Sequence, residues 1–256
     1  MPEAPDIKFL SKYLEKFILN KKIIEIKQYN KKIFDTKTTI INISSHGKNL
    51  WFETSDNLFI HLHMGLTGWL IFDKIYAKNI KYTLFFENNI ELYLTDAIKL
   101  SKLTIDNITE HNKLLNKLGI DIYSKNFKQD VFINEINRKN VNICNFLLNQ
   151  KIFAGIGNYI KCEILYIAKI DPHNKTLDIT DKQKKDLYKA IKIVSYSILY
   201  DLYKIEHIKI NKIKNVKIEQ PYVFKVYDKI EDLFGNKITT EYIGGRKTYY
   251  VRNIQI

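Results

Sequence analysis

The spacing of apolar residues changes three times along this chain of 256 residues, and these changes limit the folds that it can adopt. Over residues 4–19 the apolar side chains recur every three to four positions, which predicts an amphipathic helix. Between Lys22 and Ile105 they form short alternating or continuous runs bounded by Asn, Asp, Ser and Gly, which predicts the strands of a β-sandwich or barrel. From about Asp130 the helical spacing returns, and the final stretch alternates again on both sides of Gly244-Gly245.

These patterns predict an α+β protein built from separate regions. An N-terminal helix and β-sandwich domain is expected over 1–110, a polar linker over 111–129, a helical domain over 130–220 and a β-hairpin over 221–256. The sandwich strands are expected at Ile23–Gln28, Thr39–Ile43, Leu50–Glu53, Leu58–His63, Tyr82–Glu87, Ile90–Leu94 and Lys99–Thr104. The helices are expected at 131–136, at 141–148, at about 158–168, and after Thr180-Asp181-Lys182-Gln183, which has the sequence of a capping box. The hairpin strands are expected at Tyr222–Tyr227, Ile238–Ile243 and Thr248–Ile254.

The charge of the chain suggests a polyanionic partner but does not establish one. Lys and Arg number 41 against 28 Asp and Glu, so the net charge is +13, and such an excess attracts nucleic acids. Only Arg138, Arg246 and Arg252 are arginines, however, and the chain is rich in Ile, Asn, Tyr and Phe, whose codons, like those of lysine, are A/T-rich. Nucleic-acid binding and compositional drift therefore both remain open. No apolar run reaches the roughly 18 residues of a membrane span, and the start lacks a signal peptide, so a soluble, intracellular protein without membrane contact is expected.

The N-terminus is the first place where chemistry is expected. Met1 before Pro2 is normally removed, which leaves a free secondary amine. A terminal amine has an ordinary pKa near 8, against about 10.4 for lysine, so it is more often unprotonated and able to form an imine. Glu3 beside it can act as an acid or base. Ordinary helix capping by Pro and acidic residues is the alternative interpretation.

Two further motifs could bind an anion. Lys48 follows a glycine turn at a strand start, and His61 and His63 lie on one face of a strand; phosphate contact or packing suits them better than metal, because no carboxylate or cysteine follows at ligand spacing. Asn158 ends Gly155-Ile156-Gly157-Asn158 before a helix, where backbone N–H groups attract anions; a DNA phosphate or an ordinary turn both fit. The two cysteines, Cys144 and Cys162, match no zinc spacing and are expected to be buried thiols.

Taken together and in this order, the motifs resemble the Fpg/Nei family of bifunctional DNA glycosylases (formamidopyrimidine-DNA glycosylase and endonuclease VIII). The resemblance covers nearly the whole chain, and its most diagnostic part is the helix-two-turn-helix segment. It rests on Met1-Pro2-Glu3, Lys48, Gly65-Leu66-Thr67-Gly68, Leu118-Gly119, Gln150, the segment from Ala154-Gly155-Ile156-Gly157-Asn158 through Glu163 to Asp171-Pro172, and Gly244-Gly245-Arg246-Lys247-Thr248-Tyr249-Tyr250.

The resemblance implies roles for individual residues. Pro2 would attack C1′ of the damaged nucleotide to give a Schiff base, and Glu3 would donate the proton that opens the sugar. Lys48 would contact phosphate and assist β-elimination, while His63, Asn158 and Arg246 would contact phosphates, Arg246 also being linked to δ-elimination. Leu66 would fill the gap left by the flipped base. The implied partner is DNA with oxidised bases or abasic sites, double- or single-stranded, bound by a monomer without a cofactor or metal.

The chain also departs from the family pattern. The family usually has a C-terminal zinc finger with four cysteines, but no cysteine follows Cys162, so we expect a zincless finger held by Phe224, Tyr227, Phe234, Tyr242 and Tyr249 or Tyr250. Asp96-Ala97-Ile98-Lys99-Leu100 stands where the family has an Arg-Arg-Phe or Arg-Lys-Phe stretch. Ile98 has no donors with which to read the opposite base, so oxidised pyrimidines and hydantoins are expected to be preferred over 8-oxoguanine. Asp6 stands where Glu is common.

Two other functions fit parts of the sequence. One is a non-catalytic damaged-DNA or chromatin binding protein on the same scaffold, which would not need the free terminal amine. The other is a basic RNA-binding protein whose charge reflects codon bias alone.

Overall fold

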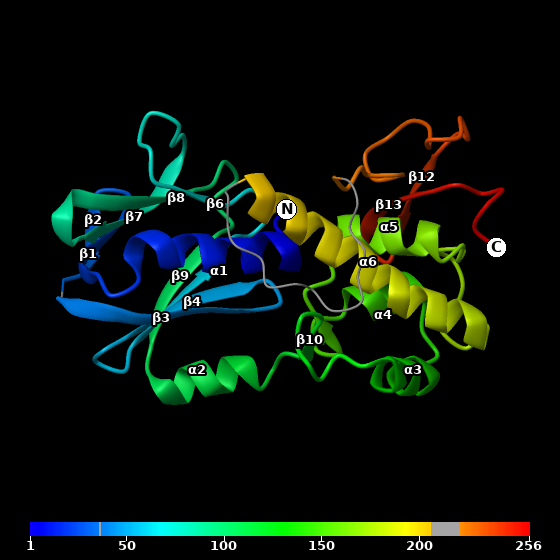
Figure 1. Cartoon of the computed structure of the whole chain (residues 1–256), viewed down its shortest axis with the longest axis horizontal. Helices are drawn as coiled ribbons and strands as arrows, with labels where there is room; N and C mark the ends of the chain where they lie inside the picture. Colours follow the sequence, from blue (N-terminus) through cyan, green and yellow to red (C-terminus); the bar gives the residue numbers. More distant parts are fainter. Residues whose placement is uncertain (36, 206–220) are drawn as a thin grey trace. The chain divides into compact units, whose positions relative to one another are not determined.

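The structure is a computed structural model that describes residues 1–35, 37–205 and 221–256 (Figure 1). The chain divides into two compact units, Met1–Lys117 and Leu118–Ile256, each with its own core. The helical domain was expected over 130–220, and its residues 206–220 lie outside the described residues. No described helix is long and apolar enough to cross a membrane.

The first unit begins with one α-helix, continues with the strands of an antiparallel sheet folded into two layers, and ends with a shorter helix. The strands run in the order β6-β8-β7-β1-β3-β4-β5-β9, with β2 paired to β1. Figure 1 shows the β1, β2, β7 and β8 layer on one side of α1 and β3 and β4 on the other. The elements are α1 (Ala4–Ile18), β1 (Lys22–Gln28), β2 (Lys31–Phe34), β3 (Thr38–His46), β4 (Asn49–Thr54), β5 (Phe59–His63), β6 (Trp69–Ile71), β7 (Ile80–Phe86), β8 (Ile90–Thr95), β9 (Lys102–Asp106) and α2 (Ile108–Leu115).

Helix α1 forms as its sequence predicts. Asp6 accepts the backbone N–H of Glu3 at 2.7 Å and completes a capping box at the helix start. The apolar stripe at Ile7, Leu10 and Leu14 is fully buried, largely against β3. Each such side chain contributes roughly 1.5–3 kcal/mol of hydrophobic stabilisation. The Asp that replaces the family's usual Glu at position 6 therefore still caps the helix.

Several short elements were not predicted. Strands β2 and β6 are short and lie at or beside sheet edges, where alternation gives little signal. The segment 111–129, expected to be a linker, contains the second half of α2 and the strand β10 (Ile120–Asp121). Helix α2 forms there because Asn107 and Glu110 make a capping box and His111 is buried against the sheet.

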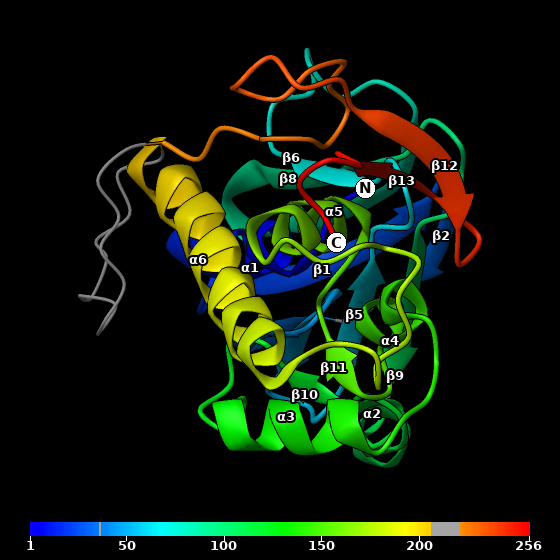
Figure 2. The ribbon, with the colours of Figure 1, turned by 90° about the vertical axis from the view of Figure 1, so that its right-hand side faces the viewer.

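The second unit is helical with a β-hairpin, as expected. Its elements are β10, α3 (Gln129–Asn137), α4 (Ile143–Leu148), β11 (Phe153–Ala154), α5 (Asn158–Ile167), α6 (Asp181–Ile205), β12 (Thr239–Ile243) and β13 (Arg246–Tyr250). The predicted capping box is present, because the Gln183 N–H donates to Thr180 Oγ1 and Gln183 Oε1 accepts from the Thr180 N–H. Figure 2 shows α5 at the centre of this unit, beside α6 and the hairpin.

The prediction of a strand at Tyr222–Tyr227 is wrong. The backbone N–H groups of Lys225, Val226 and Tyr227 all donate to the carboxylate of Glu163, at 2.8–2.9 Å. The Tyr222 hydroxyl donates to the same carboxylate at 2.6 Å, and burial together with this carboxylate raises the pKa of Tyr222. Three donors that converge on one buried side chain cannot also serve a β-ladder, so the segment curls around Glu163.

The hairpin core is formed in part by the residues expected. Tyr227 packs on Tyr249 and on Tyr159 of α5, and Val226, Ile238 and Val251 complete a buried cluster. The expected contributions of Phe234 and Tyr242 are wrong, because these side chains are 81% and 80% exposed. The turn at Gly235 leaves Phe234 outside because its backbone N–H is drawn to Asp232.

Asp232 holds the turn that precedes β12. Its carboxylate accepts the N–H groups of Phe234 and Asn236 and the hydroxyl of Tyr166 on α5, at 2.8–2.9 Å. Burial alone would raise the pKa of Asp232, but hydrogen bonds from Asn236, Tyr166 and Phe234 outweigh it and lower the pKa to about 2. Among the described residues, no group of three or more His, Cys, Asp or Glu is placed to hold a metal ion.

We expect the hairpin to depend on Asp232 and to be independent of metal. Asp232→Asn replaces an acceptor with a donor facing backbone N–H groups, and should destabilise the second unit by roughly 1–3 kcal/mol. Calorimetric melting of this variant and of Glu231→Gln, which changes an exposed neighbouring carboxylate, measures the effect. A chelator should leave the melting temperature of the native protein unchanged; a fall on chelation would contradict this account.

A pair of buried histidines joins α2 to the sheet of the first unit. His61 Nε2 lies 3.0 Å from His111 Nδ1, and the His111 ring stacks on Phe59 with centroids 3.9 Å apart. Burial lowers the pKa of both histidines. Nearby carboxylates raise these pKa values without reversing the change: Asp106 acts on both histidines, and Glu53 acts on His111. A short contact between two imidazoles requires at least one to be neutral.

The first unit should therefore lose stability in mild acid. In the unfolded chain these histidines bind protons near pH 6.5, whereas in the folded unit they resist protonation. Their contribution to the free energy of unfolding is therefore fully present above about pH 6.5 and is lost as the pH falls toward the lowered pKa values of the folded state. Trp51 and Trp69 are the only tryptophans and both belong to this unit, so urea unfolding followed by tryptophan fluorescence at pH 7.5 and 5.5 measures it alone. His111→Phe keeps the stack on Phe59 and should reduce the pH dependence; an unchanged dependence would contradict the assignment.

Candidate active site

The start of α1 positions the predicted nucleophile and its acidic neighbour. Pro2 is half-buried directly before the helix, and Glu3 is only 1% exposed at its N-cap. A carboxylate is costly to bury, but a helix N-terminus favours negative charge. The capping interaction of Asp6 with the Glu3 backbone fixes the direction in which the chain enters the helix.

Lys48 and His63 meet at one edge of the sheet. Lys48 lies in the turn between β3 and β4, and the next residue, Asn49, pairs with His63 of β5, which in turn pairs with Lys102 of β9. Desolvation of the His63 ring and the charges of Lys48 and Lys102 lower the pKa of His63, although the residue as a whole is exposed. His63 Nδ1 accepts the Gly65 N–H at 3.1 Å, which also favours neutral imidazole. These residues form a basic edge suited to a phosphate.

His61 and His63, expected on one face of a strand and suited to phosphate contact or packing, have different surroundings. Both belong to β5, but His61 is buried against His111 whereas His63 lies at the exposed strand end. The structure therefore divides the two histidines between packing and the basic edge.

Leu66 is carried by a turn that is fixed to the loop from Asp96 to Ser101. Thr67 Oγ1 donates to the buried Asp96 carboxylate at 2.5 Å, and the Ser101 N–H donates to the same side chain. Gly65 has a φ of +61°, and an added Cβ would lie 2.8 Å from the backbone carbon of Leu100. The turn and the loop therefore form one rigid feature.

Buried Lys81 fixes the far side of this loop. Its Nζ donates to the carbonyls of Lys99 and Ser101 at 2.7 and 2.5 Å. The loop presents Ile98 and Leu100, which are 46% and 53% exposed, next to half-buried Leu66. An apolar wedge of three aliphatic side chains results, and we call it the aliphatic wedge.

In the second unit, Gln150 shapes the turn before α5. Its amide group donates to the carbonyl of Ile156 and accepts the N–H of Gly155, at 2.8 and 2.9 Å. The turn delivers Asn158 to the first position of α5, where the helix dipole favours an anion.

Asn158 is brought together with the turn that carries Arg246. Asn158 Nδ2 donates to the carbonyl of Lys247 at 2.8 Å. Arg246, the residue directly before Lys247, is exposed. Gly244 has a φ of +62°, and an added Cβ would lie 2.2 Å from Oδ1 of Asn145 on α4. The two predicted phosphate contacts, Asn158 and Arg246, are therefore held on one framework.

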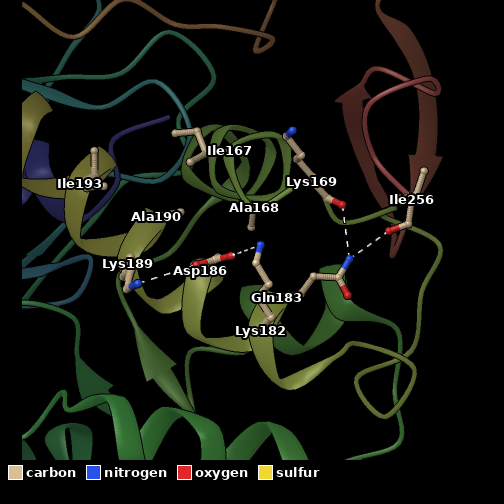
Figure 3. Close-up of a pocket in the computed structure, with 10 residues that line it drawn as sticks. All are labelled: Ile167, Ala168, Lys169, Lys182, Gln183, Asp186, Lys189, Ala190, Ile193 and Ile256. Carbon is tan, nitrogen blue, oxygen red and sulfur yellow. Dashed lines mark hydrogen bonds and ion pairs between the residues drawn. The ribbon is translucent and has the colours of Figure 1, made fainter.

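A cavity of about 420 Å³ elsewhere in the second unit contains none of these residues. It lies between the end of α5 and the first half of α6 (Figure 3). There Gln183 Nε2 donates to the carbonyl of Ile256 at 3.2 Å, and Lys182 and Lys189 pair with Asp186. The Gln183 contact attaches the last residue to α6, and the two ion pairs lie within that helix, so we assign this cavity to packing.

Comparison with known proteins finds a matching domain in each of the two units. Residues 1–103 match the formamidopyrimidine-DNA glycosylase N-terminal domain and residues 118–201 match the formamidopyrimidine-DNA glycosylase H2TH domain. The formamidopyrimidine-DNA glycosylase of Ligilactobacillus salivarius is 30% identical over 202 residues, which cover 73% of each protein. The chain belongs to the Fpg/Nei family. This is a family of DNA glycosylases of base excision repair.

Further relatives extend the similarity over the chain. The formamidopyrimidine-DNA glycosylase of a Wolbachia from Brugia malayi is 28% identical over 205 residues, or 75% of this chain and 76% of that protein. A crystal structure of Lactococcus lactis Fpg, noncovalently bound to DNA containing an AP site, matches 99% of both chains with 25% identity and a TM-score of 0.79. The α+β fold with a C-terminal hairpin is thus confirmed as the Fpg fold.

Several residues support these features through contacts that the sequence did not predict. They are Lys81, Asp96, Lys102, Lys161 and Glu163. In a chain with 41 basic residues a single lysine carries little information. One signal was available: Lys161 and Glu163 interrupt an otherwise apolar helix, and charges inside an apolar stretch are expected to be paired or hydrogen-bonded.

Proposed function

We propose that this Fpg/Nei protein is a bifunctional DNA glycosylase and AP lyase that excises oxidised bases through Pro2. The observation that carries the proposal is the buried carboxylate of Glu3 directly beside Pro2 at the head of α1. A binding protein has no need to bury an acid next to its terminal amine, whereas imine chemistry needs an acid–base group at that position.

In the proposed reaction the residues act one after another. After removal of Met1, the Pro2 nitrogen attacks C1′, and the base leaves with the electron pair of the glycosidic bond and takes up the proton that the nitrogen loses. Glu3 protonates the sugar ring oxygen as the C1′–O4′ bond breaks, which leaves an iminium on Pro2. Loss of a C2′ proton then expels the 3′-phosphate by β-elimination, with Lys48 assisting, and Arg246 supports a second elimination.

The phosphate contacts and the partner are part of the same proposal. Lys48 and His63 on the basic edge of the first unit would contact DNA phosphates, and Asn158 and Arg246 in the second unit would hold the phosphates that flank an extruded nucleotide. A planar guanidinium such as Arg246 can bind a phosphate through two hydrogen bonds. Damaged or abasic DNA is therefore the proposed partner, and the Lactococcus lactis relative was crystallised with such DNA.

The aliphatic wedge supports a preference for oxidised pyrimidines and hydantoins over 8-oxoguanine. Ile98 and Leu100 have no hydrogen-bond donors, and Lys99 Nζ lies over the Tyr29 ring, 6.0 Å from its centroid. Leu66, Ile98 and Leu100 can fill the gap left by the flipped base but cannot read the base opposite through hydrogen bonds.

Borohydride trapping tests the lyase chemistry. Protein beginning at Pro2 should form a covalent adduct with abasic DNA, located at Pro2 by mass spectrometry, whereas protein with an N-terminal extension should not. Glu3→Gln should still be trapped on abasic DNA, where the sugar opens to its aldehyde unaided, but should cleave DNA at an oxidised base about 100-fold or more slowly, because the ring-opening step loses its acid. No adduct from protein confirmed to begin at Pro2 would rule out the lyase, and retention of Met1 with intact DNA binding would favour the non-catalytic alternative.

A cleavage panel tests the substrate preference. The native protein should cut dihydrouracil, thymine glycol and hydantoin substrates faster than 8-oxoguanine opposite cytosine, in duplex and in single-stranded DNA. Ile98→Arg adds donors at the tip of the wedge and should raise cutting opposite cytosine relative to other bases, whereas Ile98→Leu should not. Efficient cutting of 8-oxoguanine opposite cytosine by the native protein would contradict the proposed preference.

A further inference from the structure

Lys161, on α5, is a lysine with no exposed surface. Burial of an ammonium group is costly unless hydrogen bonds replace its hydration. Its Nζ donates to Asn158 Oδ1 at 2.9 Å, one turn earlier in the helix, and to Thr248 Oγ1 at 2.7 Å, on β13. Both acceptors belong to the framework that carries the proposed phosphate contacts.

The first of these bonds sets the orientation of the Asn158 amide. An ammonium group can only donate, so the oxygen of the amide must face Lys161 and its nitrogen must face away. On that side Nδ2 donates one hydrogen to the Lys247 carbonyl at 2.8 Å. The amide has a second hydrogen on the same nitrogen, so Lys161 makes Asn158 a donor toward any anion bound at the start of α5.

The second bond reaches the backbone of the turn. Thr248 Oγ1 accepts from Lys161 and donates to the carbonyl of Arg246 at 3.0 Å. One lysine is therefore connected to Asn158 by a direct hydrogen bond, and to the backbone of Arg246 by two hydrogen bonds that pass through Thr248. Its positive charge also lies within the first turn of α5, where it adds to the positive end of the helix dipole.

We propose that Lys161 is a positioning residue for phosphate recognition, which orients Asn158 and holds the Arg246 turn without itself contacting DNA. This inference rests on the proposed function, because Asn158 and Arg246 are its phosphate contacts. It assigns to an interior lysine a role that the exposed lysines of the chain do not have.

Binding of duplex DNA with a tetrahydrofuran abasic analogue tests this role. Lys161→Met keeps an unbranched side chain of similar length and removes the charge and donors, so the Kd should rise about tenfold. Lys184→Met is the matched control: Lys184 is 7% exposed, on α6, with Nζ 3.4 Å from Asp181, and its loss should change the Kd by less than about twofold. Equal effects of the two variants would overturn the proposal.

Salt dependence distinguishes positioning from direct contact. A residue that touches a phosphate releases counterions, so Arg246→Ala should reduce the slope of log K against log salt by about one. Lys161→Met should lower affinity while leaving this slope near the native value. A slope reduced as much as that of Arg246→Ala would show that Lys161 itself contacts DNA and would overturn the positioning role.

A double-mutant cycle separates this role from general support of the fold. If Lys161 acts through Asn158, the fold-increase in Kd of Lys161→Met/Asn158→Ala should be well below the product of the fold-increases of the two single variants. A fold-increase equal to that product would overturn the proposal. If Lys161→Met fails to fold, Thr248→Val, which removes only the acceptor on β13, should raise the Kd by about threefold; no change there would also count against it. Failure of the native protein to be trapped would refute the lyase while leaving these affinity comparisons valid.

Discussion

The second unit depends on one buried carboxylate, that of Glu163. It lies at the middle of α5 and collects three consecutive backbone N–H groups and one hydroxyl from the segment that leads into the hairpin. A fully buried carboxylate is tolerated only when its hydrogen-bonding capacity is used, and here this use determines the path of the chain. Lys161, two residues earlier, donates to Thr248 on β13, close to the turn of the hairpin. A single helix of ten residues thus fixes both the entrance to the hairpin and the turn at its tip.

In the first unit, buried charged side chains likewise fix the path of a loop. Asp96 and Lys81 are buried, carry opposite charges, and bind different parts of the Asp96–Ser101 segment, one through N–H groups and the other through carbonyls. The loop cannot relax without exposing or breaking these bonds. Such rigidity would favour the proposed entry of the aliphatic wedge into a DNA duplex, because side chains that lose little conformational freedom on binding retain more of their contact energy.

Features determined by local sequence were predictable, and features determined by distant partners were not. The helix at 4–19 and the Thr180 capping box follow from spacing and capping within a few residues, and both are present. The positions of Pro2, Glu3, Lys48, Asn158 and Arg246 came from motifs along the chain. Tyr222–Tyr227 has the composition of a strand, but its hydrogen-bond partner is about sixty residues away. Phe234 looked like a core residue, yet Asp232 turns the backbone so that the ring faces outward. Lys81 could not be distinguished from the many surface lysines without the fold, and only its position inside an apolar helix set Lys161 apart.

The way in which the hairpin is closed has a chemical consequence. A finger organised by thiolates and zinc can be dismantled by the oxidants that damage bases, because thiolates are oxidised and the metal is then lost. The carboxylate of Asp232 and the packed side chains of Val226 and Val251 offer no such target. The two cysteines of the chain are buried away from solvent, and burial raises the pKa of Cys144 to about 12, which keeps it as the unreactive thiol. A hairpin built in this way can keep its shape under the oxidising conditions in which oxidised bases accumulate.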